Sequence, residues 1–166
     1  MMVRCKARTV RRLFYKLFAT KRRRFDENLE HEGRNGTILE IDPDREWFVF
    51  LADHKIEDFR EFGGPMLILF QKQRSSSIAR MRLVIDPKKL ELFIGDFVSD
   101  IENKGYGTIL LRNVIKLAKM IGLRRLTGNL SSVDSGHFEK LNHLYSKYGF
   151  VVNISGKKGT ILLEIR

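Results

Sequence analysis

From Thr37 onward the pattern of hydrophobic and polar positions is that of β-strands, with short apolar runs bounded by turn residues. Several such runs, each bounded by turn residues, follow one another along the first half of the chain. The turns include Pro43-Asp44 and the segment Asp86–Lys89. Between these turns the sequence predicts a short helix over 55–62 that ends at Gly63-Gly64. The predicted strands cover residues 37–42, 46–53, 66–73, 77–85 and 90–98.

The spacing of apolar residues changes to that of helices after residue 100. One helix is predicted from about Gly105 to Ile121, with Gly122 as a left-handed C-terminal cap. A strand over 124–132 follows. A second helix comes next, capped by Asp134 or Ser135 and ended by Gly149. Two closing strands flank residues 156–159.

This order predicts a mixed α/β (α+β) fold with a mostly antiparallel sheet flanked by helices, rather than a regular βαβ repeat. The apolar faces of the two helices are Leu111, Val114, Ile115, Ala118 and Ile121, and Phe138, Leu141, Leu144, Tyr145 and Tyr148.

The first 24 residues form a basic arm that holds ten Lys and Arg and no acidic residue. Its apolar residues Val10, Leu13, Phe14, Leu17 and Phe18 share one helical face, with basic residues around it. Such a helix suits an anionic membrane surface or nucleic acid. Alternatively, it docks its apolar stripe on the body, or the arm is disordered. Residues 21–36 are interpreted as a linker, so the predicted division is an arm and linker over 1–36 and one domain over 37–166.

The charge distribution removes the main support for a nucleic-acid-binding role of the whole fold. The chain has a net charge of +11, but removing the ten basic residues of the arm from its 31 Lys and Arg leaves 21, against 20 Asp and Glu. The single cysteine, Cys5, allows no internal disulfide, which favours a reducing, cytoplasmic location. No apolar run reaches the ~20 residues of a membrane-spanning helix. The arm's composition also overlaps with that of organelle transit peptides.

Two glycines, Gly105 and Gly107, stand at the start of the first predicted helix. A helix N-terminus offers free N–H groups and a partial positive charge, and glycines let an anion approach the backbone. The amides of residues 103–108, with Lys104 beside them, could therefore hold a phosphate. The segment is not a Walker loop, and Leu110 occupies the place of the third glycine of the dinucleotide-binding motif. The alternative is a plain tight turn.

Two motifs in residues 90–150 resemble the GNAT superfamily of acetyl-CoA-dependent N-acyltransferases. The loop ENKGYG, Glu102–Gly107, is similar to the pyrophosphate loop of that family, and LYSKYGF, Leu144–Phe150, is similar to the end of its second helix. The resemblance covers about 60 residues with the expected strand between the motifs. It implies a sheet that is splayed at the cofactor site, with an extra basic helix at the N-terminus of this chain.

The resemblance implies a role for each matching position. The backbone of Gly95, Asp96 and Phe97 would contact the pantetheine arm of acetyl-CoA. The amides of Asn103, Lys104, Gly105, Tyr106, Gly107 and Thr108 would hold its pyrophosphate. A primary amine would attack the thioester directly. Tyr145 would be the general acid, although its position on an apolar helix face also suits a core residue.

The sequence departs from the family pattern at three positions. Glu102 replaces the usual Gln or Arg of the loop, Phe138 replaces an Asn that contacts the cofactor, and the strand around Asn129 lacks the usual Glu base. Asp96, Asp134 or His137 could draw the amine's proton through water. The four histidines are scattered, so no metal site is predicted.

Three functions are therefore open, and one of them is a nucleic-acid or membrane-surface protein whose function resides in its basic arm. The first is an N-acetyltransferase that moves an acetyl group from acetyl-CoA to a primary amine. The second is a catalytically weak or inactive CoA-binding module, tethered by its arm to nucleic acid or an anionic membrane. The sequence does not identify the acceptor amine. The two closing strands often form dimer contacts in the family, so a homodimer is a further expectation.

Overall fold

A computed structural model describes residues 25–34, 36–52, 64–72, 77–101, 104–131 and 136–165 of the chain. Several sequence predictions lie outside these ranges. They are the basic helix of the arm, the short helix over 55–62, and the roles given to Glu102, Asn103, Asp134 and Ser135.

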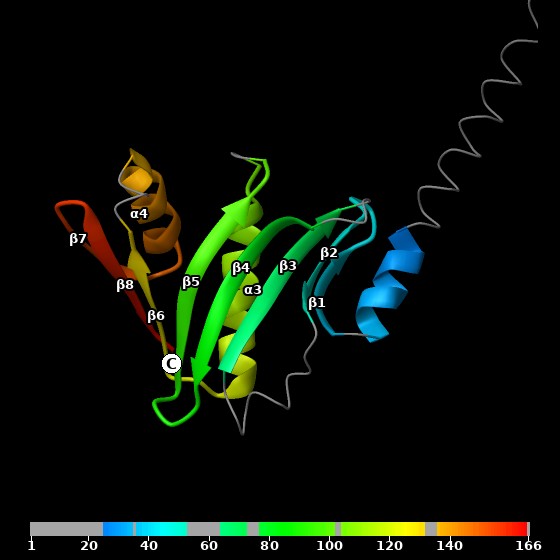
Figure 1. Ribbon diagram of the computed structural model, residues 1–166, viewed down its shortest axis with the longest axis horizontal. Coiled ribbons are helices and arrows are strands. Elements are labelled where there is room, and N and C mark those ends of the chain that lie inside the picture. The colour runs from blue at the N-terminus through cyan, green and yellow to red at the C-terminus, as the bar shows by residue number, and fades with distance from the viewer. Residues whose placement is uncertain are drawn as a thin grey trace, which may run out of the picture.

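The described residues form one eight-stranded sheet with helices on its faces (Figure 1). The strand order is β1-β2-β3-β4-β5-β6-β8-β7, and every neighbouring pair is antiparallel except β5 with β6. This confirms the predicted fold class, and the elements follow the predicted order. Their bounds are β1 Thr37–Asp42, β2 Trp47–Leu51, β3 Gly64–Lys72, β4 Ser77–Asp86, β5 Glu91–Ser99, α3 Tyr106–Ile121, β6 Arg125–Leu130, α4 Phe138–Lys147, β7 Val151–Ser155 and β8 Lys158–Glu164.

Strand β2 has no polar residue because both of its faces are buried. Trp47, Val49 and Leu51 belong to the main core, whereas Phe48 and Phe50 face the other side of the sheet. There they pack with Phe25, whose ring meets that of Phe48 edge-on with centroids 5.8 Å apart. An apolar run of this kind is expected for a strand covered on both faces.

Phe25 belongs to a helix over 25–34, which corrects the prediction of a linker over 21–36. The helix lies beside the β1–β2 hairpin at one end of the sheet (Figure 1). The polar composition of the segment concealed it, because only Phe25 and the partly buried Leu29 supply its apolar contact. Burial of one aromatic side chain, rather than a full apolar stripe, therefore fixes this helix on the sheet.

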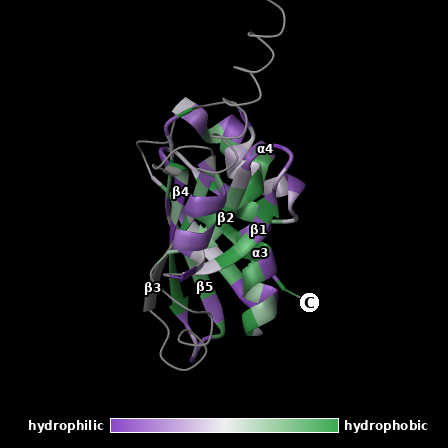
Figure 2. Ribbon diagram, turned by 90° about the vertical axis from the view of Figure 1, so that its right-hand side faces the viewer, coloured by the Kyte–Doolittle hydropathy of each residue, from purple (hydrophilic) through white to green (hydrophobic). Residues whose placement is uncertain are grey.

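Helix α3 covers the centre of the opposite face of the sheet. Its buried residues Leu110, Leu111, Val114, Leu117 and Ala118 keep helical spacing and form the main core with the sheet. Figure 2 shows hydrophobic and hydrophilic residues alternating along this helix. Gly122 ends it in the left-handed conformation, as predicted. No helix among the described residues is long and apolar enough to cross a membrane.

Candidate functional site

The central feature of the candidate site is a split between the two parallel strands of the sheet. β5 and β6 are paired only from Glu91 with Arg125 to Ile94 with Gly128. Both strands continue beyond this point, and Figure 1 shows them diverging toward their C-terminal ends. The backbone edge of β5 beyond Ile94 is therefore not paired with β6. This confirms the predicted splay of the sheet.

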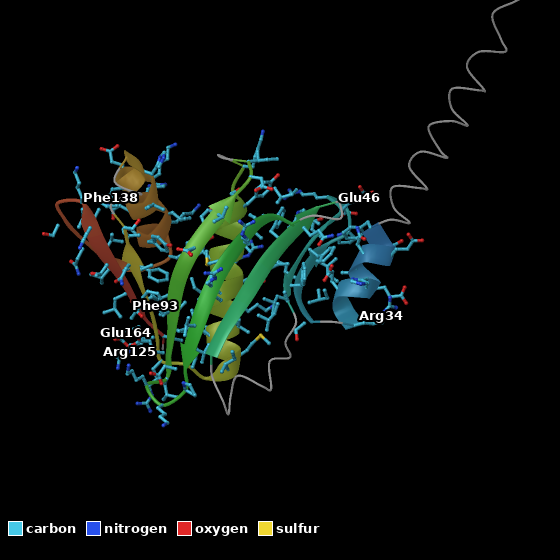
Figure 3. All side chains as sticks on the ribbon, in the orientation of Figure 1. Arg34, Glu46, Phe93, Arg125, Phe138 and Glu164 are labelled. Carbon is cyan, nitrogen blue, oxygen red and sulfur yellow. The ribbon has the colours of Figure 1, made fainter. Side chains whose placement is uncertain are left out.

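The narrow end of the split is held by a glycine and by polar side chains. A β-carbon at Gly128 would lie 2.8 Å from the carbonyl oxygen of Ile94, so only glycine allows the strands to meet this closely. Thr127 Oγ1 donates a hydrogen bond to Glu91 Oε1 at 3.0 Å. Arg125, labelled in Figure 3, places its Nε 3.6 Å from Glu91 Oε2. The contacts of Glu91 thus join β5 to β6 at the start of the paired stretch, whereas Gly128 belongs to its last pair, where the strands part.

A β-bulge lies on β5 at the point where the split begins. Met81 pairs with Phe97 and Leu83 pairs with Ile94, so β5 has one residue more than β4 over this interval. Gly95 and Asp96 are the residues opposite Arg82, and a β-carbon at Gly95 would lie 3.2 Å from the Arg82 carbonyl oxygen. Bulges bend a strand and redirect its side chains. Here the bulge turns the end of β5 away from β6.

Positions 105 and 107 of the loop suit glycine for two different structural reasons. Gly105 precedes α3 with φ 77°, a left-handed conformation, and a β-carbon there would meet nothing within 4 Å. Its backbone conformation therefore requires glycine. Gly107 lies in the first turn of α3, where a β-carbon would be 3.2 Å from Cζ of Phe97 and 3.5 Å from Cδ2 of Leu144. Close packing between α3, β5 and α4 therefore favours a residue without a side chain at this second position.

The first turn of α3 has the features of an anion site. The Ile109 N–H donates to the carbonyl oxygen of Gly105 at 3.2 Å, and the amides of Tyr106, Gly107 and Thr108 precede it in the first turn. Among the described residues no side chain caps this helix, and its first turn holds no acidic residue. Lys104 is exposed just before it. Unpaired N–H groups and a nearby cation favour the binding of a phosphate.

The side chain of Tyr106 does not point to the anion site. Its ring stacks on Phe70 with centroids 4.5 Å apart, and Phe70 in turn lies 5.4 Å from Trp47. This aromatic row fixes the start of α3 on β3 and β2. Only the backbone amide of Tyr106 is therefore suited to the role that the sequence predicted for this residue.

Helix α4 lies against the loop and carries the predicted general acid. Besides the contact of Leu144 with Gly107, the hydroxyl of Tyr148 donates to the carbonyl oxygen of Thr108 at 3.4 Å. Tyr145 is 5% exposed, and its ring packs edge-on against Phe150 with centroids 5.3 Å apart. The structure thus places Tyr145 in the core next to the site. Both interpretations of this residue, general acid and core aromatic, agree with its position.

Two of the three predicted bases are described by the structure. Asp96 is exposed on the bulge, and its Oδ2 lies 3.8 Å from Nη1 of Arg82. His137 precedes α4, is exposed and makes no capping hydrogen bond through its side chain. Asp134 lies outside the described residues. No group of three or more His, Cys, Asp or Glu that could hold a metal occurs in the described part of the chain.

Sequence reasoning missed several residues that shape the site. It gave no role to Gly128 at the narrow end of the split, to Arg82 beside Asp96, or to the aromatic row under Tyr106. A glycine within a predicted strand was the available signal for Gly128, because glycine there often marks a close backbone approach. No sequence pattern pointed to Arg82, because its proximity to Asp96 depends on the bulge in β5.

Comparison with known proteins agrees with this geometry. No protein-family model matches the sequence. The uncharacterized protein YocC of Bacillus subtilis is 25% identical over 135 residues, which cover 79% of this chain and 77% of YocC.

Solved structures with the same fold include an acetyltransferase of the GNAT family from Streptococcus pneumoniae. It has a TM-score of 0.51 and 19% identity, over 62% of this chain and 68% of that one. Spermidine N-acetyltransferase from Vibrio cholerae has a TM-score of 0.51 and 13% identity, over 65% and 69%. The GNAT domain of S. lividans PAT has a TM-score of 0.50 and 13% identity, over 68% and 70%. The chain therefore has the fold of the GNAT superfamily, as the two sequence motifs predicted.

Proposed function

We propose that this protein is an N-acetyltransferase that moves an acetyl group from acetyl-CoA to a primary amine. The observation that supports this most directly is the combination of a split sheet with an uncapped helix start beside it. The free edge of β5 after Ile94 and the first turn of α3 meet where Phe97 contacts Gly107. One extended ligand with a phosphate group could contact both features at once.

Acetyl-CoA has the shape and charge that these two features require. Its pyrophosphate would accept hydrogen bonds from the amides at the start of α3, with Lys104 adding positive charge. Its pantetheine arm carries amide groups, which would pair with the unpaired backbone of residues 95–97 much as an added strand pairs with a sheet edge. The arm would then pass through the split between β5 and β6.

The proposed reaction is a direct transfer. The amine nitrogen attacks the thioester carbonyl carbon, a C–N bond forms, and negative charge develops on the carbonyl oxygen. In this proposal a backbone N–H of the β5 bulge donates a hydrogen bond to this oxygen and stabilises its negative charge. The C–S bond then breaks, and the thiolate takes a proton from the Tyr145 hydroxyl, because a phenol can serve as the general acid for a leaving thiolate.

The proton released by the amine needs an acceptor. Asp96 is the candidate that the bulge presents directly beside the split, and its exposure allows a water to relay the proton. Arg82, whose Nη1 lies 3.8 Å from Asp96 Oδ2, is the neighbouring charged side chain. His137 and Asp134 are the remaining candidates.

The alternative function is a CoA-binding module with little or no turnover, and the burial of Tyr145 agrees with it equally well. A phenol that is 5% exposed is as well suited to packing as to proton transfer. In this alternative the basic arm would tether the module to nucleic acid or an anionic membrane. Binding of acetyl-CoA is common to both functions, whereas turnover of an amine belongs to the first alone.

Calorimetric titration of the full chain with acetyl-CoA tests what both functions share. We expect micromolar binding, and weaker binding of pantetheine derivatives that lack the pyrophosphate. Release of free thiol in the presence of a panel of amines then separates the enzyme from the binding module. No binding at millimolar acetyl-CoA would refute both, and would leave Gly105 and Gly107 as purely structural residues.

A further inference from the structure

Two arginines of β4 lie on the face of the sheet that α3 does not cover. Side chains alternate along a strand, and Ala79, Met81 and Leu83 belong to the main core, which α3 shares. Arg80 and Arg82 therefore point to the opposite face, where both are exposed. The helix over 25–34 also packs on that face, but at β1 and β2 (Figure 1). Within the described ranges, no helix covers this face at β4 and β5.

The bulge of β5 brings the candidate base Asp96 to the same open face. The ring of Phe97 points to α3, where it contacts Gly107, whereas Asp96 before it meets Arg82. The Oδ2 atom of Asp96 lies 3.8 Å from Nη1 of Arg82, and the two side chains are 78% and 68% exposed. An exposed ion pair of this kind is weak, so Arg82 remains able to bind a second anion. An amine that reaches the split from this face would thus find Asp96 with a cation beside it.

Arg80 is a cation without a carboxylate partner. It forms no ion pair with any residue that the structure describes. Its backbone pairs with Val98, the next residue of β5 on this face after Asp96. Arg80 and Arg82 are two residues apart, which is about 7 Å along a strand. Guanidinium groups are planar and match the geometry of carboxylate oxygens, so the two side chains can hold one carboxylate between them.

The charges on this face fit one amine and one anion. On the other side of the split, the exposed residue of β6 after Gly128 is the neutral Asn129. Two arginines and one acid therefore stand beside the split among the described residues of this face. A diamine would need an acid for each of its ends, whereas a molecule with an amine and a carboxylate satisfies both kinds of charge.

We propose that the acceptor of the acetyl group is an amino acid or another small amine that carries a carboxylate. Its amine lies beside Asp96, and its carboxylate binds between Arg80 and Arg82. This inference rests on the proposed acetyl transfer and adds the class of acceptor to it.

Three amines with the same carbon chain test the class of acceptor. They are 5-aminopentanoate, 5-aminopentanamide and 1,5-diaminopentane, which end in a carboxylate, a neutral amide and a second ammonium group. Release of free thiol from acetyl-CoA by the full chain is measured with each. We expect kcat/KM to be about tenfold higher for the carboxylate than for the amide, as a hydrogen bond to a charged group implies, and to be lowest for the diamine.

Arg80→Gln should remove the preference for the carboxylate over the amide, mainly through a higher KM for 5-aminopentanoate. Lys88→Gln is the matched control, because Lys88 is an exposed cation that follows the other end of β4. This control should keep the preference. Equal use of the three amines, faster use of the diamine, or a preference that persists in Arg80→Gln would overturn the inference and leave the proposed function intact.

Binding without turnover separates failure of this inference from failure of the proposed function. The three amines are titrated by calorimetry into the full chain saturated with CoA, and into Arg80→Gln in the same state. A chain that does not bind CoA is titrated with the amines alone. Binding of 5-aminopentanoate that depends on Arg80, without thiol release, would refute acetyl transfer but support the carboxylate site. Absence of 5-aminopentanoate binding, or binding equal to that of the amide, would overturn the site.

Discussion

The ring of Phe97 lies against the backbone of Gly107, so that a β-carbon at Gly107 would be 3.2 Å from its Cζ and 3.3 Å from its Cε1. This contact joins the two parts of the proposed acetyl-CoA site, because Phe97 follows the bulge of β5 and Gly107 belongs to the first turn of α3. The distance between the strand edge and the helix amides therefore depends on the absence of a side chain at residue 107.

Gly107→Val should push the start of α3 away from β5. Overpacking of this kind typically costs about 1–3 kcal/mol of stability. We expect acetyl-CoA to bind about tenfold more weakly, which corresponds to about 1.4 kcal/mol. Calorimetry and denaturant unfolding measure the two effects. Gly136→Ala is the matched control, because a β-carbon there meets nothing within 4 Å.

A second substitution separates packing at residue 107 from a general effect of the new side chain. Phe97→Leu shortens the ring that a side chain at residue 107 would meet, so the double variant should recover part of the lost affinity. Additive effects of the two substitutions would contradict the contact, since residues that touch are expected to be coupled.

Gly105 should respond to substitution through its backbone alone. Its φ of 77° costs a residue with a β-carbon roughly 1–2 kcal/mol, while asparagine tolerates this conformation better. Gly105→Ala should therefore lower the free energy of unfolding by that amount, and Gly105→Asn by less. Denaturant unfolding of the three proteins measures the order. Equal losses for Ala and Asn would show that the conformation of Gly105 is not what requires glycine.

Tyr145→Phe separates the proposed enzyme from the binding module. Removing a general acid typically slows turnover by about 10²–10⁴-fold. We expect that loss in kcat with little change in acetyl-CoA affinity, because the ring and its contact with Phe150 stay. Tyr148→Phe is the control, as it removes only the hydroxyl that donates to Thr108. Unchanged turnover in Tyr145→Phe would exclude the hydroxyl of Tyr145 as the proton donor.

Phe25 should matter to stability although it precedes the predicted domain. Its side chain is 3% exposed and packs on Phe48, and removing a buried phenylalanine side chain typically costs about 3–5 kcal/mol. We expect Phe25→Ala to lower the free energy of unfolding within that range. Glu30→Ala is the control, because it removes only an exposed ion pair with Arg34. Equal stabilities of the two variants would mean that the helix over 25–34 is not fixed on the sheet in solution.

Asp86 should contribute to the loss of stability in acid. The backbone N–H of Lys89, 3.1 Å from Oδ1, lowers the pKa of this carboxyl, with further contributions from the Lys89 ammonium and the Lys88 N–H. A lowered folded-state pKa means that the stabilisation is present above the unfolded-state pKa and is lost as pH falls through the folded-state pKa. Thermal unfolding of Asp86→Asn should therefore depend less on pH below about pH 4 than that of the natural protein. Identical slopes would contradict this assignment.

Local patterns were sufficient for the elements of the fold and for their order. Short apolar runs between turn residues predicted each described strand, and helical spacing predicted α3 and α4 with their glycine ends. The GxG loop and the Leu144–Phe150 motif predicted the GNAT fold because both depend on residues close together in the sequence. The helix over 25–34 was missed because its contact with β2 depends on a single buried aromatic residue.

What the amino-acid sequence by itself determined is the set of backbone requirements, such as a left-handed residue before α3 and an apolar face on each helix. Only the tertiary structure decided which residues meet. The bulge places Asp96 beside Arg82, the close approach of strands requires Gly128, and the register of β4 with β5 places Arg80 opposite Val98. These relationships depend on register and on the distance between elements. Such properties arise when the sheet assembles and leave no periodic pattern in the sequence.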